Sequence, residues 1–506
     1  MNDKFEQTYR QACDHARQAA VFAAIQATLD WDERTMMPTP AAEYRAEQTA
    51  VISGVTHKQW VEPRFGDWLE ELAGSPLAQD PYSDRGATIR ELKRQRDRAA
   101  KLPQSLVEAL ARAAVLGQNA WQEARRKADF AQFRPYLDNM LALKRQQAAA
   151  IGYTESPYDA LLDDYEPAAL SSQVTQVLAG LRNELAPLVA EIRQSGRQAD
   201  VAILARRYPV AVQEQFGREA AARIGFDFNR GRLDATVHPF CTTLGPHDCR
   251  ITTRYNERHF NEAFFGILHE AGHGIYEQGL RSDEYGLPLG QAVSLGIHES
   301  QSRLWENMVG RSLPFWKYLY PEARRRFPEA LSDVALQDFY FAANDVRPSL
   351  IRVEADEATY NLHIVIRFEL EQALVVDNLR VGDLPGAWNE ACRKYLSIDP
   401  TDDAVGVLQD VHWSAGLIGY FPTYALGNLC AAQLFRKADQ ELGGLEALIS
   451  SGQFLPLRQW LGEKIHAQGQ RFPAAELIRR VTGEPLSHRP LIDYLRAKLG
   501  PLYGLA

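Results

Sequence analysis

The chain has 506 residues, of which 45% are hydrophobic and 24% charged. This composition is that of an ordinary folded protein, and it excludes a disordered, collagen-like or coiled-coil chain. Its 56 Lys and Arg residues against 65 Asp and Glu residues give a net charge of −9, so we expect no nucleic acid as a partner.

The N-terminal segment and the cysteines bear on location. The first ten residues are polar and charged, and the apolar stretch at 19–29 is too short and wrongly flanked for a signal peptide. The five cysteines form an odd set without a CxxC pair, which is typical of a reducing compartment. We therefore expect a cytoplasmic protein that is not bound to a membrane.

Helical periodicity dominates the sequence. Between Val174 and Leu188 the apolar residues recur every three or four positions, which places them on one buried helix face. The same pattern, in chain order, covers residues 5–29, 89–102, 106–127, 133–151, 336–346, 360–379 and 457–465. Breaks rich in Gly, Pro, Ser or Asp, none long enough for a linker, fall at 74–81, 194–198, 281–288 and 397–403. The sequence predicts a mainly α-helical protein with two helical lobes in a single domain spanning residues 1–506.

One stretch departs from the helical period. Residues 235–241 and 249–255 are rich in Val, Phe, Thr, Ile and Tyr, and they flank Gly245-Pro246-His247-Asp248. This is the composition of a β-hairpin, and an edge strand of such a hairpin can pair with an extended peptide backbone. We expect the hairpin to lie beside a functional site, because the residues with the clearest chemistry follow it directly.

A metal-binding pattern comes next along the chain. Residues 261–278 are predicted to form a helix closed by Gly279, and this helix contains an HExxH sequence from His269 to His273. Histidines four positions apart lie on one helix face with Cβ atoms about 5 to 6 Å apart, so both imidazoles can bind one ion while Glu270 reaches its water.

A catalytic zinc site needs a third protein ligand and an open position for water. The next predicted helix, 289–311, starts after Pro288 and carries His298 and Glu299, and Glu299 stands 26 residues after His273. Consecutive helical residues diverge by about 100°, so only one of this pair can face the metal. We expect Glu299 to be the third ligand, with His298 as the competitor.

The outer shell of the predicted site departs from a common arrangement. Many zinc sites of this type place a carboxylate four residues after the ligand Glu, where it orients a histidine. That position is Arg303 in this chain. The orienting carboxylate is therefore expected elsewhere, at Glu306 or Asp356.

These residues predict hydrolysis of a peptide bond. Zinc lowers the pKa of its bound water toward about 7 and polarises a carbonyl, while Glu270 accepts the proton and later delivers it to the leaving amine. The transition-state oxygen needs a further donor, and His412, Tyr420 and Tyr424 crowd one segment. Packing in the core is the other explanation for these side chains. Their segment, 411–435, lacks Asp, Glu, Lys and Arg, but its Gly, Pro and polar residues favour a buried, irregular core segment over a membrane span.

Several further motifs accompany the metal-binding pattern. They are His238-Pro239-Phe240, Asp248-Cys249-Arg250-Ile251-Thr252, IRVEAD at 351–356, GVLQDVHW at 406–413, and Trp31-Asp32 with Thr35-Met36-Met37-Pro38 near the N-terminus. Together with HExxH and with HESQ at 298–301, these motifs resemble those of the M32 metallocarboxypeptidases, of the carboxypeptidase Taq type. The resemblance covers most of the chain.

The resemblance implies a broad-specificity carboxypeptidase that removes residues one at a time from peptides with a free C-terminus. It also implies a homodimer with one zinc ion, or cobalt, per subunit. The implied fold is like those of neurolysin and angiotensin-converting enzyme, in which two helical lobes surround a deep groove and a small β-hairpin or sheet lies beside the active site. His269, His273 and Glu299 would be the ligands and Glu270 the general base, as the spacing predicts.

An exopeptidase must recognise the free carboxylate of its substrate, which favours a cation with fork geometry. Arg352 is the first candidate and Arg250 the second, with a structural pair to Asp248 as the alternative for Arg250. By the resemblance, the hairpin motifs would close one end of the groove and limit how far the substrate extends. Catalytic roles are further expected for Tyr420 and His412, and substrate contacts for His238, Pro239, Phe240, Asp248, Thr252, His298, Gln301, Asp356, Gln409, Asp410 and Tyr424.

Two other functions remain open at this point. An oligoendopeptidase or dipeptidyl carboxypeptidase would use the same zinc chemistry in a differently closed groove, and amidation of the substrate C-terminus separates it from a carboxypeptidase. A noncatalytic binding protein with a structural zinc would need a closed four-ligand site, and the sequence supplies no clear fourth ligand.

Overall fold

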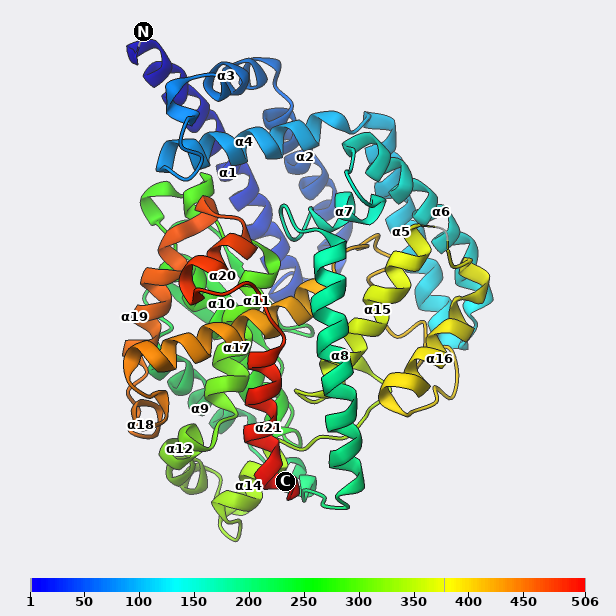
Figure 1. The fold of residues 1–506 in the computed structure, drawn as a ribbon, viewed down its shortest axis with the longest axis vertical. Helices are drawn as coiled ribbons and strands as arrows, with labels where there is room; N and C mark the ends of the chain where they lie inside the picture. The colour runs from blue at the N-terminus through cyan, green and yellow to red at the C-terminus, as the bar shows by residue number, and fades with distance from the viewer. Residues whose placement is uncertain (1, 377, 506) are drawn as a thin grey trace. The chain divides into compact units, whose positions relative to one another are not determined.

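The computed structural model describes residues 2–376 and 378–505. Helices make up most of these residues (Figure 1). The described residues also form a three-stranded sheet. The chain divides into two compact units, each assembled from three separate segments. Unit 1 comprises the chain up to residue 100 with 200–343 and 434–483, and unit 2 comprises 101–199, 344–433 and the chain from 484 onward. The expected mainly helical fold is confirmed.

The helices of unit 1 are α1 (Asn2–Thr35), α2 (Ala42–Trp60), α3 (Pro63–Ala73), α4 (Asp84–Lys101), α9 (Val210–Ile224), α10 (Phe260–Gly279), α11 (Leu295–Arg303), a π-helix (Leu304–Gly310), α12 (Leu313–Arg326), α13 (Pro328–Leu331), α14 (Leu336–Ala343), α18 (Leu445–Ser450), α19 (Leu455–Lys464) and α20 (Ala474–Thr482). Those of unit 2 are α5 (Gln104–Lys127), α6 (Phe130–Ile151), α7 (Pro157–Leu162), α8 (Ser171–Gln194), α15 (Thr359–Val375), α16 (Leu384–Leu396) and α21 (Arg489–Tyr503), and α17 (Pro422–Leu442) runs from unit 2 into unit 1. Short 3-10 turns lie at Thr39–Ala41, Pro76–Ala78, Val201–Ala205, Ser282–Glu284, Pro288–Gly290, Arg352–Glu354, Val381–Asp383 and His466–Arg471.

Helix α10 is the central element of unit 1, in contact with α9, α11, the π-helix and strand β3. Its N-terminal half is fixed by aromatic packing: Phe260 stacks on Phe264 with ring centroids 5.2 Å apart, and Phe264 lies 5.2 Å from Trp316. Such buried aromatic clusters bury much apolar area and hold their members in defined orientations. The C-terminal half of α10, which carries the histidines, is therefore anchored on a rigid core.

The sheet of unit 1 has the order β1-β3-β2. Strands β2 (Cys241–Thr243) and β3 (Cys249–Thr253) form an antiparallel hairpin around the Gly245–Asp248 turn, as predicted. The predicted strand at 235–241 is wrong, because only its two end residues lie in strands. Pro239 lacks the N–H that a ladder requires. Residues 236–240 are not in a strand, although the Thr236 N–H donates to Thr253 O and Phe240 O accepts from the Thr252 N–H.

Strand β1 (Gly231–Ala235) was not predicted, and it pairs in parallel with β3. Its Arg and Asp residues hide the usual strand composition. Gly231 is required there, because a Cβ atom would lie 2.4 Å from the carbonyl oxygen of Cys249.

Two predicted helix ends near the histidines need correction. Residues 289–311 do not form one α-helix. Helix α11 begins only after Ser294, whose side chain caps it by accepting from the Ile297 N–H, and the α-helix changes to a π-helix at Leu304. Gly279 does not close α10 in a left-handed turn, since it is the last helical residue. Glycine is needed at 279 because a Cβ atom would lie 2.3 Å from Nδ1 of His466.

The apolar patterns of unit 2 predict its helices closely. The predicted face of 174–188 is buried in α8 at Val174, Leu178, Leu181, Leu185 and Leu188. Helix α15 ends at Val375, before the predicted end at Leu379, and residue 377 of that prediction lies outside the described residues. Helix α14, in unit 1, likewise ends at Ala343 rather than at the predicted 346.

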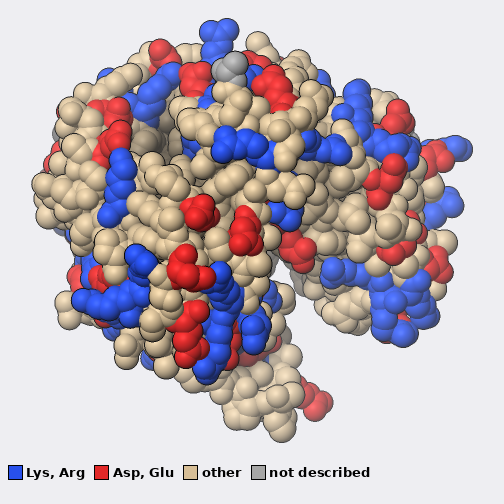
Figure 2. Space-filling view, turned by 90° about the horizontal axis from the view of Figure 1, so that it is seen from below, with Lys and Arg blue, Asp and Glu red and all other residues tan. Residues whose placement is uncertain are grey.

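The uncharged segment 411–435 is largely buried, irregular up to Phe421 and helical from Pro422. No helix among the described residues is long and apolar enough to cross a bilayer. On the face shown in Figure 2, Lys and Arg side chains are interspersed with Asp and Glu side chains.

Candidate metal centre

Helix α10 places His269 and His273 on one face, one turn apart, with ring centroids separated by 4.9 Å. Both rings are largely buried, and both present Nε2 toward α11. The i, i+4 spacing alone produces this arrangement, as the sequence predicted.

Glu299 of α11 completes a cluster of three possible ligands. Its Oε2 lies 3.7 Å from His269 Nε2 and 3.4 Å from His273 Nε2. The ligand atoms of the three residues all lie within 4.8 Å of one another, and theirs is the one such group among the described residues. We call His269, His273 and Glu299 the metal centre. Two imidazoles and a carboxylate are a donor set typical of a catalytic zinc site.

The close approach of α10 and α11 depends on Gly272, a position that the sequence pattern left unspecified. A Cβ atom at 272 would lie 2.6 Å from the Cα of Ser302 and 2.7 Å from the carbonyl oxygen of Gln301. Both are backbone atoms, which cannot move aside like a flexible side chain. Glycine inside HExxH therefore sets the distance between the two histidines and Glu299.

Glu306, on the π-helix, supplies the orienting carboxylate for His269. Its Oε2 accepts a hydrogen bond from His269 Nδ1 over 2.9 Å. Of the two predicted candidates, Glu306 is thus the one that orients His269. Asp356 instead accepts from the backbone N–H groups of Ala358 and Thr359 at the start of α15.

Arg303, which stands where a carboxylate was expected, holds two acidic side chains. Its Nε donates to Glu299 Oε1 over 2.7 Å and its Nη1 to Glu306 Oε2 over 3.1 Å. Burial alone would raise the pKa of both carboxyls, but Arg303 and the neighbouring histidines hold the pKa of each well below its usual range. Both side chains are therefore carboxylates, the form that a metal ligand and its orienting partner require.

The two histidines differ in their surroundings. Burial lowers the pKa of His273 to about 3, so its ring is neutral. Burial alone would also lower the pKa of His269, but Glu299 and Glu306 raise it above its usual value. A divalent ion would compete with that proton, because imidazole binds metals only when neutral.

Glu270 lies beside the metal centre, and one of its carboxyl oxygens is free of hydrogen bonds to the described residues. Its side chain is buried, and within the described residues its Oε2 has no hydrogen-bond partner. Burial raises the pKa of this carboxyl to about 7. A carboxyl of that pKa can accept and return a proton near neutrality.

His298 does not compete with Glu299 for the metal centre. Its Nδ1 lies 2.5 Å from His273 Nδ1, and its Nε2 lies 2.8 Å from Glu277 Oε1. The expected divergence of consecutive helical residues is therefore confirmed. Gln301 of the same motif is also buried, and its Oε1 lies 3.0 Å from Nε2 of His466.

The hairpin residues of unit 1 form contacts among themselves. Arg250 binds both oxygens of Asp248 over 2.9 Å, and its guanidinium lies 4.2 Å from the ring centre of Trp31. This is the structural pair that was the alternative for Arg250. Thr252 exchanges hydrogen bonds with the backbone of Phe240, while His238 and Pro239 are exposed.

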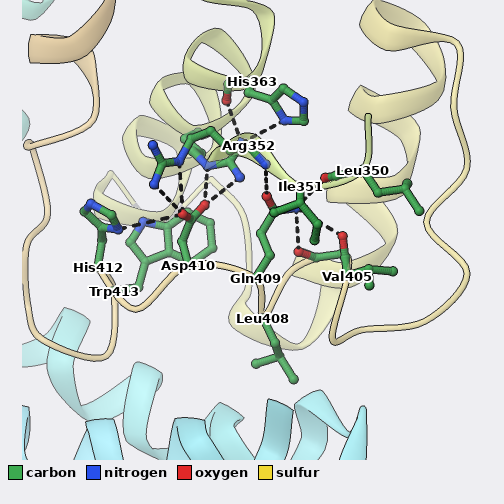
Figure 3. A network of polar contacts seen from close by, with 12 residues as sticks. Leu350, Ile351, Arg352, His363, Val405, Leu408, Gln409, Asp410, His412 and Trp413 are labelled. Atoms are coloured by element: carbon green, nitrogen blue, oxygen red, sulfur yellow. Dashed lines mark hydrogen bonds and ion pairs between the residues drawn. The ribbon is translucent and has the colours of Figure 1, made fainter. Parts of the chain in front are cut away.

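Arg352 lies in unit 2, at the centre of a buried polar network (Figure 3). Its Nε and Nη2 donate to Asp410 Oδ1 over 3.0 and 2.8 Å, and its Nη1 donates to Tyr360 over 3.0 Å. Gln409 accepts from the backbone N–H of Arg352 over 2.8 Å. The sequence motifs IRVEAD and GVLQDVHW therefore meet at this point.

A second arginine, which the sequence did not single out, shares the same carboxylate. Arg367 on α15 is fully buried, and its Nε donates to Asp410 Oδ2 over 2.6 Å. We call Arg352, Arg367 and Asp410 the guanidinium cluster. Burial lowers the pKa of the neighbouring His363 to about 3 and that of His412 to about 4. Both are neutral at pH 7, so the cluster carries two positive charges against one negative charge.

His412, Tyr420 and Tyr424 come together in unit 2 as the sequence predicted. His412 Nε2 lies 3.4 Å from the Tyr424 hydroxyl, and the ring of Tyr420 lies 5.5 Å from that of His412 and 5.3 Å from that of Tyr424. His412 also packs on Phe421, with ring centroids 4.4 Å apart. Polar atoms and core packing thus coexist in this group.

Comparison with known proteins gives consistent matches along nearly the whole chain. The family model described as carboxypeptidase Taq (M32) metallopeptidase matches residues 11–499. The chain is 47% identical to thermostable carboxypeptidase 1 of Thermus thermophilus, with 99% of each chain covered, and 39% identical to carboxypeptidase 1 of Bacillus subtilis, with 97% and 98% covered. The solved M32 carboxypeptidase from Deinococcus radiodurans superposes with a TM-score of 0.95 at 39% identity, covering 98% of this chain and all of that one. The Pyrococcus furiosus carboxypeptidase superposes with a TM-score of 0.93 at 34% identity, covering 97% and 98%.

Proposed function

The chain belongs to the carboxypeptidase Taq (M32) family of metallopeptidases and is a metallocarboxypeptidase, and on that premise we propose that it releases single C-terminal residues from peptides with Glu270 as general base. The observation that carries the proposal is the convergence of two imidazoles and a carboxylate within 4.8 Å, beside a buried carboxyl oxygen without a partner. Broad specificity at the released residue is part of the proposal, by similarity to the family.

Zinc is the ion that we propose, with cobalt as the alternative and one ion per subunit. His269, His273 and Glu299 would hold it, and three protein ligands leave a position open for water and substrate. Bound there, a divalent ion would lower the pKa of water and polarise the scissile carbonyl.

Glu270 then performs the proton transfers. It accepts a proton from the attacking water and delivers it to the leaving amine, which is the proton balance that peptide hydrolysis requires. Its raised pKa, about 7, suits both directions of transfer at neutral pH. Glu299 and Glu306 remain ionised throughout, because Arg303 pairs with both.

We propose that Tyr420 and His412 stabilise the developing negative charge on the carbonyl oxygen. A phenol hydroxyl and a neutral imidazole N–H are both suitable donors. Burial keeps His412 neutral, so that it can donate without carrying a charge of its own. Tyr424, which lies within 3.4 Å of His412, would contact substrate beside them.

Arg352 is the proposed receptor of the substrate carboxylate. The guanidinium cluster holds an excess positive charge in a buried region, and an uncompensated buried charge is costly. A free C-terminal carboxylate would supply the missing negative charge. Asp410 and Gln409 would hold Arg352 in position, and Asp356 would fix the segment through the start of α15.

The hairpin has a more limited proposed role. Asp248 pairs with Arg250 through both carboxylate oxygens, whereas Asp410 is shared by Arg352 and Arg367, which makes Arg250 the weaker candidate for the carboxylate. We propose that His238, Pro239, Phe240 and Thr252 border the substrate groove and limit its length, and that Gln301 supports the helix that carries Glu299. A homodimer acting on peptides in the cytoplasm completes the proposal, in keeping with five free cysteines.

A pair of peptides tests the proposal. A short peptide and its C-terminally amidated twin are incubated with zinc-loaded and with chelator-treated protein, and released amino acids are quantified over time. Stepwise release from the free peptide alone, lost on chelation, is expected. Internal cleavage of both peptides at equal rates would contradict the carboxypeptidase reaction and the role of Arg352.

A further inference from the structure

Three side chains extend from the metal centre to the sheet of unit 1. Nδ1 of His273 lies 2.5 Å from Nδ1 of His298, and Nε2 of His298 lies 2.8 Å from Oε1 of Glu277. The other oxygen of Glu277 accepts from Thr243 Oγ1 on strand β2 over 2.8 Å. The residues involved come from α10, α11 and β2, so the series ties three elements together.

The proton positions along this series follow from counting donors and acceptors. A nitrogen that binds a metal carries no proton, so a His273 that offers Nε2 to the metal centre carries its proton on Nδ1. Nδ1 of His298 must then be the acceptor, because two protonated nitrogens cannot face each other at 2.5 Å. His298 accordingly carries its own proton on Nε2, where Glu277 accepts it.

The orientation of His298 is fixed by packing as well. The ring of Tyr276 lies 5.2 Å from that of His298, and the Tyr276 hydroxyl accepts from the backbone N–H of Val293. His298 and Glu277 also line a cavity of about 420 Å³, together with Cys241 and Thr243. Part of this series of side chains therefore borders a cavity.

We propose that His298, Glu277 and Thr243 are positioning residues for the metal ligand His273. The Glu277 carboxylate acts through the His298 ring to fix the tautomer and orientation of His273 and to raise its basicity toward the metal, as a directly bonded carboxylate does in other metal sites. The inference rests on the proposed function, since it takes His269, His273 and Glu299 as the metal ligands.

The two histidine ligands are then supported differently. His269 is bonded directly to a carboxylate, Glu306, whereas His273 reaches its carboxylate through a second imidazole. His298 is thereby given a role other than the contact with substrate that the sequence predicted. The two roles have separable consequences, because a substrate contact affects the Michaelis constant for the peptide and a positioning residue affects the affinity for the metal.

Zinc affinity tests the inference most directly. The zinc dissociation constant is measured by competition with a chromophoric chelator for wild type, His298→Phe and Glu277→Leu. Each variant is expected to bind zinc about 10- to 100-fold more weakly, the usual effect of removing an outer-shell partner. The double variant should bind no more weakly than the poorer single variant, because both changes interrupt one series.

Milder variants keep the test decisive if the first pair fails to fold. Glu277→Gln retains an oxygen that can accept from His298, and it should fall between wild type and Glu277→Leu. Thr243→Val removes one hydrogen bond to Glu277 and should weaken zinc binding in the same direction by a smaller factor. Glu284→Leu is the matched control, since the Glu284 carboxylate pairs with Arg281 elsewhere in unit 1; its zinc affinity should equal that of wild type.

A spectroscopic signature accompanies the affinities. In the cobalt-loaded protein, the visible absorption bands should change in position or intensity in His298→Phe and Glu277→Leu, and remain unchanged in Glu284→Leu. A role confined to folding stability would leave the spectrum of the cobalt-loaded, folded protein unaltered.

Two results would overturn the inference. One is a zinc dissociation constant within twofold of the wild-type value in the folded variants of His298 and Glu277. The other is a raised Michaelis constant with unchanged zinc affinity in His298→Phe, which would assign His298 to the substrate. Failure of the proposed function gives a different result. A wild-type protein that binds zinc but releases no C-terminal residue would contradict the proposed function, while the zinc affinities of wild type and the His298 and Glu277 variants would still test this inference.

Discussion

The metal centre of unit 1 and the guanidinium cluster of unit 2 are buried charge networks with different balances of charge. Around the metal centre, the carboxylates of Glu299 and Glu306 are balanced by Arg303 and Arg311, and the imidazoles of His269 and His273 and the Glu299 carboxylate offer ligand atoms to a cation. In the guanidinium cluster, Arg352 and Arg367 share the single carboxylate of Asp410. One region therefore suits a cation and the other an anion.

This difference shows how the charge balance and donor atoms of a buried network indicate the charge of the ligand that it can bind. Taking charges out of water is costly unless they are paired. An excess of buried charge of one sign is therefore expected only where an oppositely charged ligand binds. A divalent ion and a substrate carboxylate are the two compensating charges that a metallocarboxypeptidase requires. The predictions below change the charge or the geometry of one region at a time.

Removing a metal ligand should have the largest effect. His273→Ala takes one of three ligands from the metal centre, and we expect zinc affinity to fall by more than the roughly 100-fold that an outer-shell change produces, with loss of zinc-dependent release of amino acids. Chelator competition measures the affinity. His259→Ala is the control, because His259 precedes the first residue of the same helix and its side chain is 57% exposed. Equal zinc affinity in His273→Ala and wild type would show that His273 is not a zinc ligand.

Replacing the proposed anion receptor should act on one class of substrate. Arg352→Gln removes a buried charge that would pair with the substrate carboxylate, and losing one partner of such a pair costs about 2 to 5 kcal/mol. We expect kcat/KM for a peptide with a free C-terminus to fall about 30-fold or more. Arg347→Gln, at a largely exposed arginine of unit 2, should leave it near the wild-type value. An unchanged kcat/KM in a folded Arg352→Gln protein would show that the carboxylate is bound elsewhere.

A buried carboxyl next to the guanidinium cluster should make stability depend on pH. Glu371 is fully buried on α15, and burial raises its pKa to about 7, although Tyr158 and Trp413 donate hydrogen bonds to it. The folded protein therefore binds more protons than the unfolded chain between about pH 4.5 and 7, so stability falls as pH rises through that window. The loss is at most about 3 kcal/mol.

Denaturant unfolding at pH 5 and pH 8 measures this dependence. The free energy of unfolding of wild type should fall between the two pH values by up to about 3 kcal/mol more than that of Glu371→Gln. Glu369→Gln, at a partly exposed position of the same helix, is the matched control. Parallel pH profiles for wild type and Glu371→Gln would mean that folding does not raise the pKa of Glu371.

The smallest expected effect concerns the geometry of the metal centre without any change of charge. Gly272→Ala places a Cβ atom against the backbone of Gln301 and Ser302, and such overpacking costs about 1 to 3 kcal/mol. The higher helix propensity of alanine than of glycine offsets about 1 kcal/mol of this loss of stability. We expect lower stability together with weaker zinc binding. Gly266→Ala is the control, since its Cβ would meet one atom, Thr253 Oγ1, at an ordinary 3.7 Å. A stable Gly272→Ala protein with wild-type zinc affinity would show that the metal centre does not require the close approach of α10 and α11 at Gly272.

Local patterns predicted the core of the metal centre but not its surroundings. The i, i+4 spacing of His269 and His273 follows from helix geometry alone. The divergence of adjacent helical residues allowed only one of His298 and Glu299 to face the metal, and the expectation for Glu299 agrees with the structure. The pairs of Arg303 with Glu299 and Glu306 follow the i,i+4 and i,i+3 spacing of a helix. The partner of His298 depends instead on packing between elements, because Glu277 reaches it across α10 and α11. No periodicity encodes such contacts.

The same limit explains the errors in the fold. Strand β1 pairs with a strand that comes later in the chain, so its polar sequence gave no local signal. Arg367 lies on the buried helix α15, one turn from His363 and Glu371, and its pairing becomes evident only once Asp410 is seen beside it. The helices of unit 2, whose apolar faces repeat over many turns, needed no such information.

The central claim is that Glu270 acts on a substrate bound at a metal held by His269, His273 and Glu299. It is tested most directly by measuring bound zinc and the rate of C-terminal residue release in the same preparations of wild type and Glu270→Gln. Equal zinc content with a rate lower by about 100- to 10,000-fold is the predicted result, because the variant keeps the ligands and loses the base. A wild-type rate at equal zinc content would contradict it.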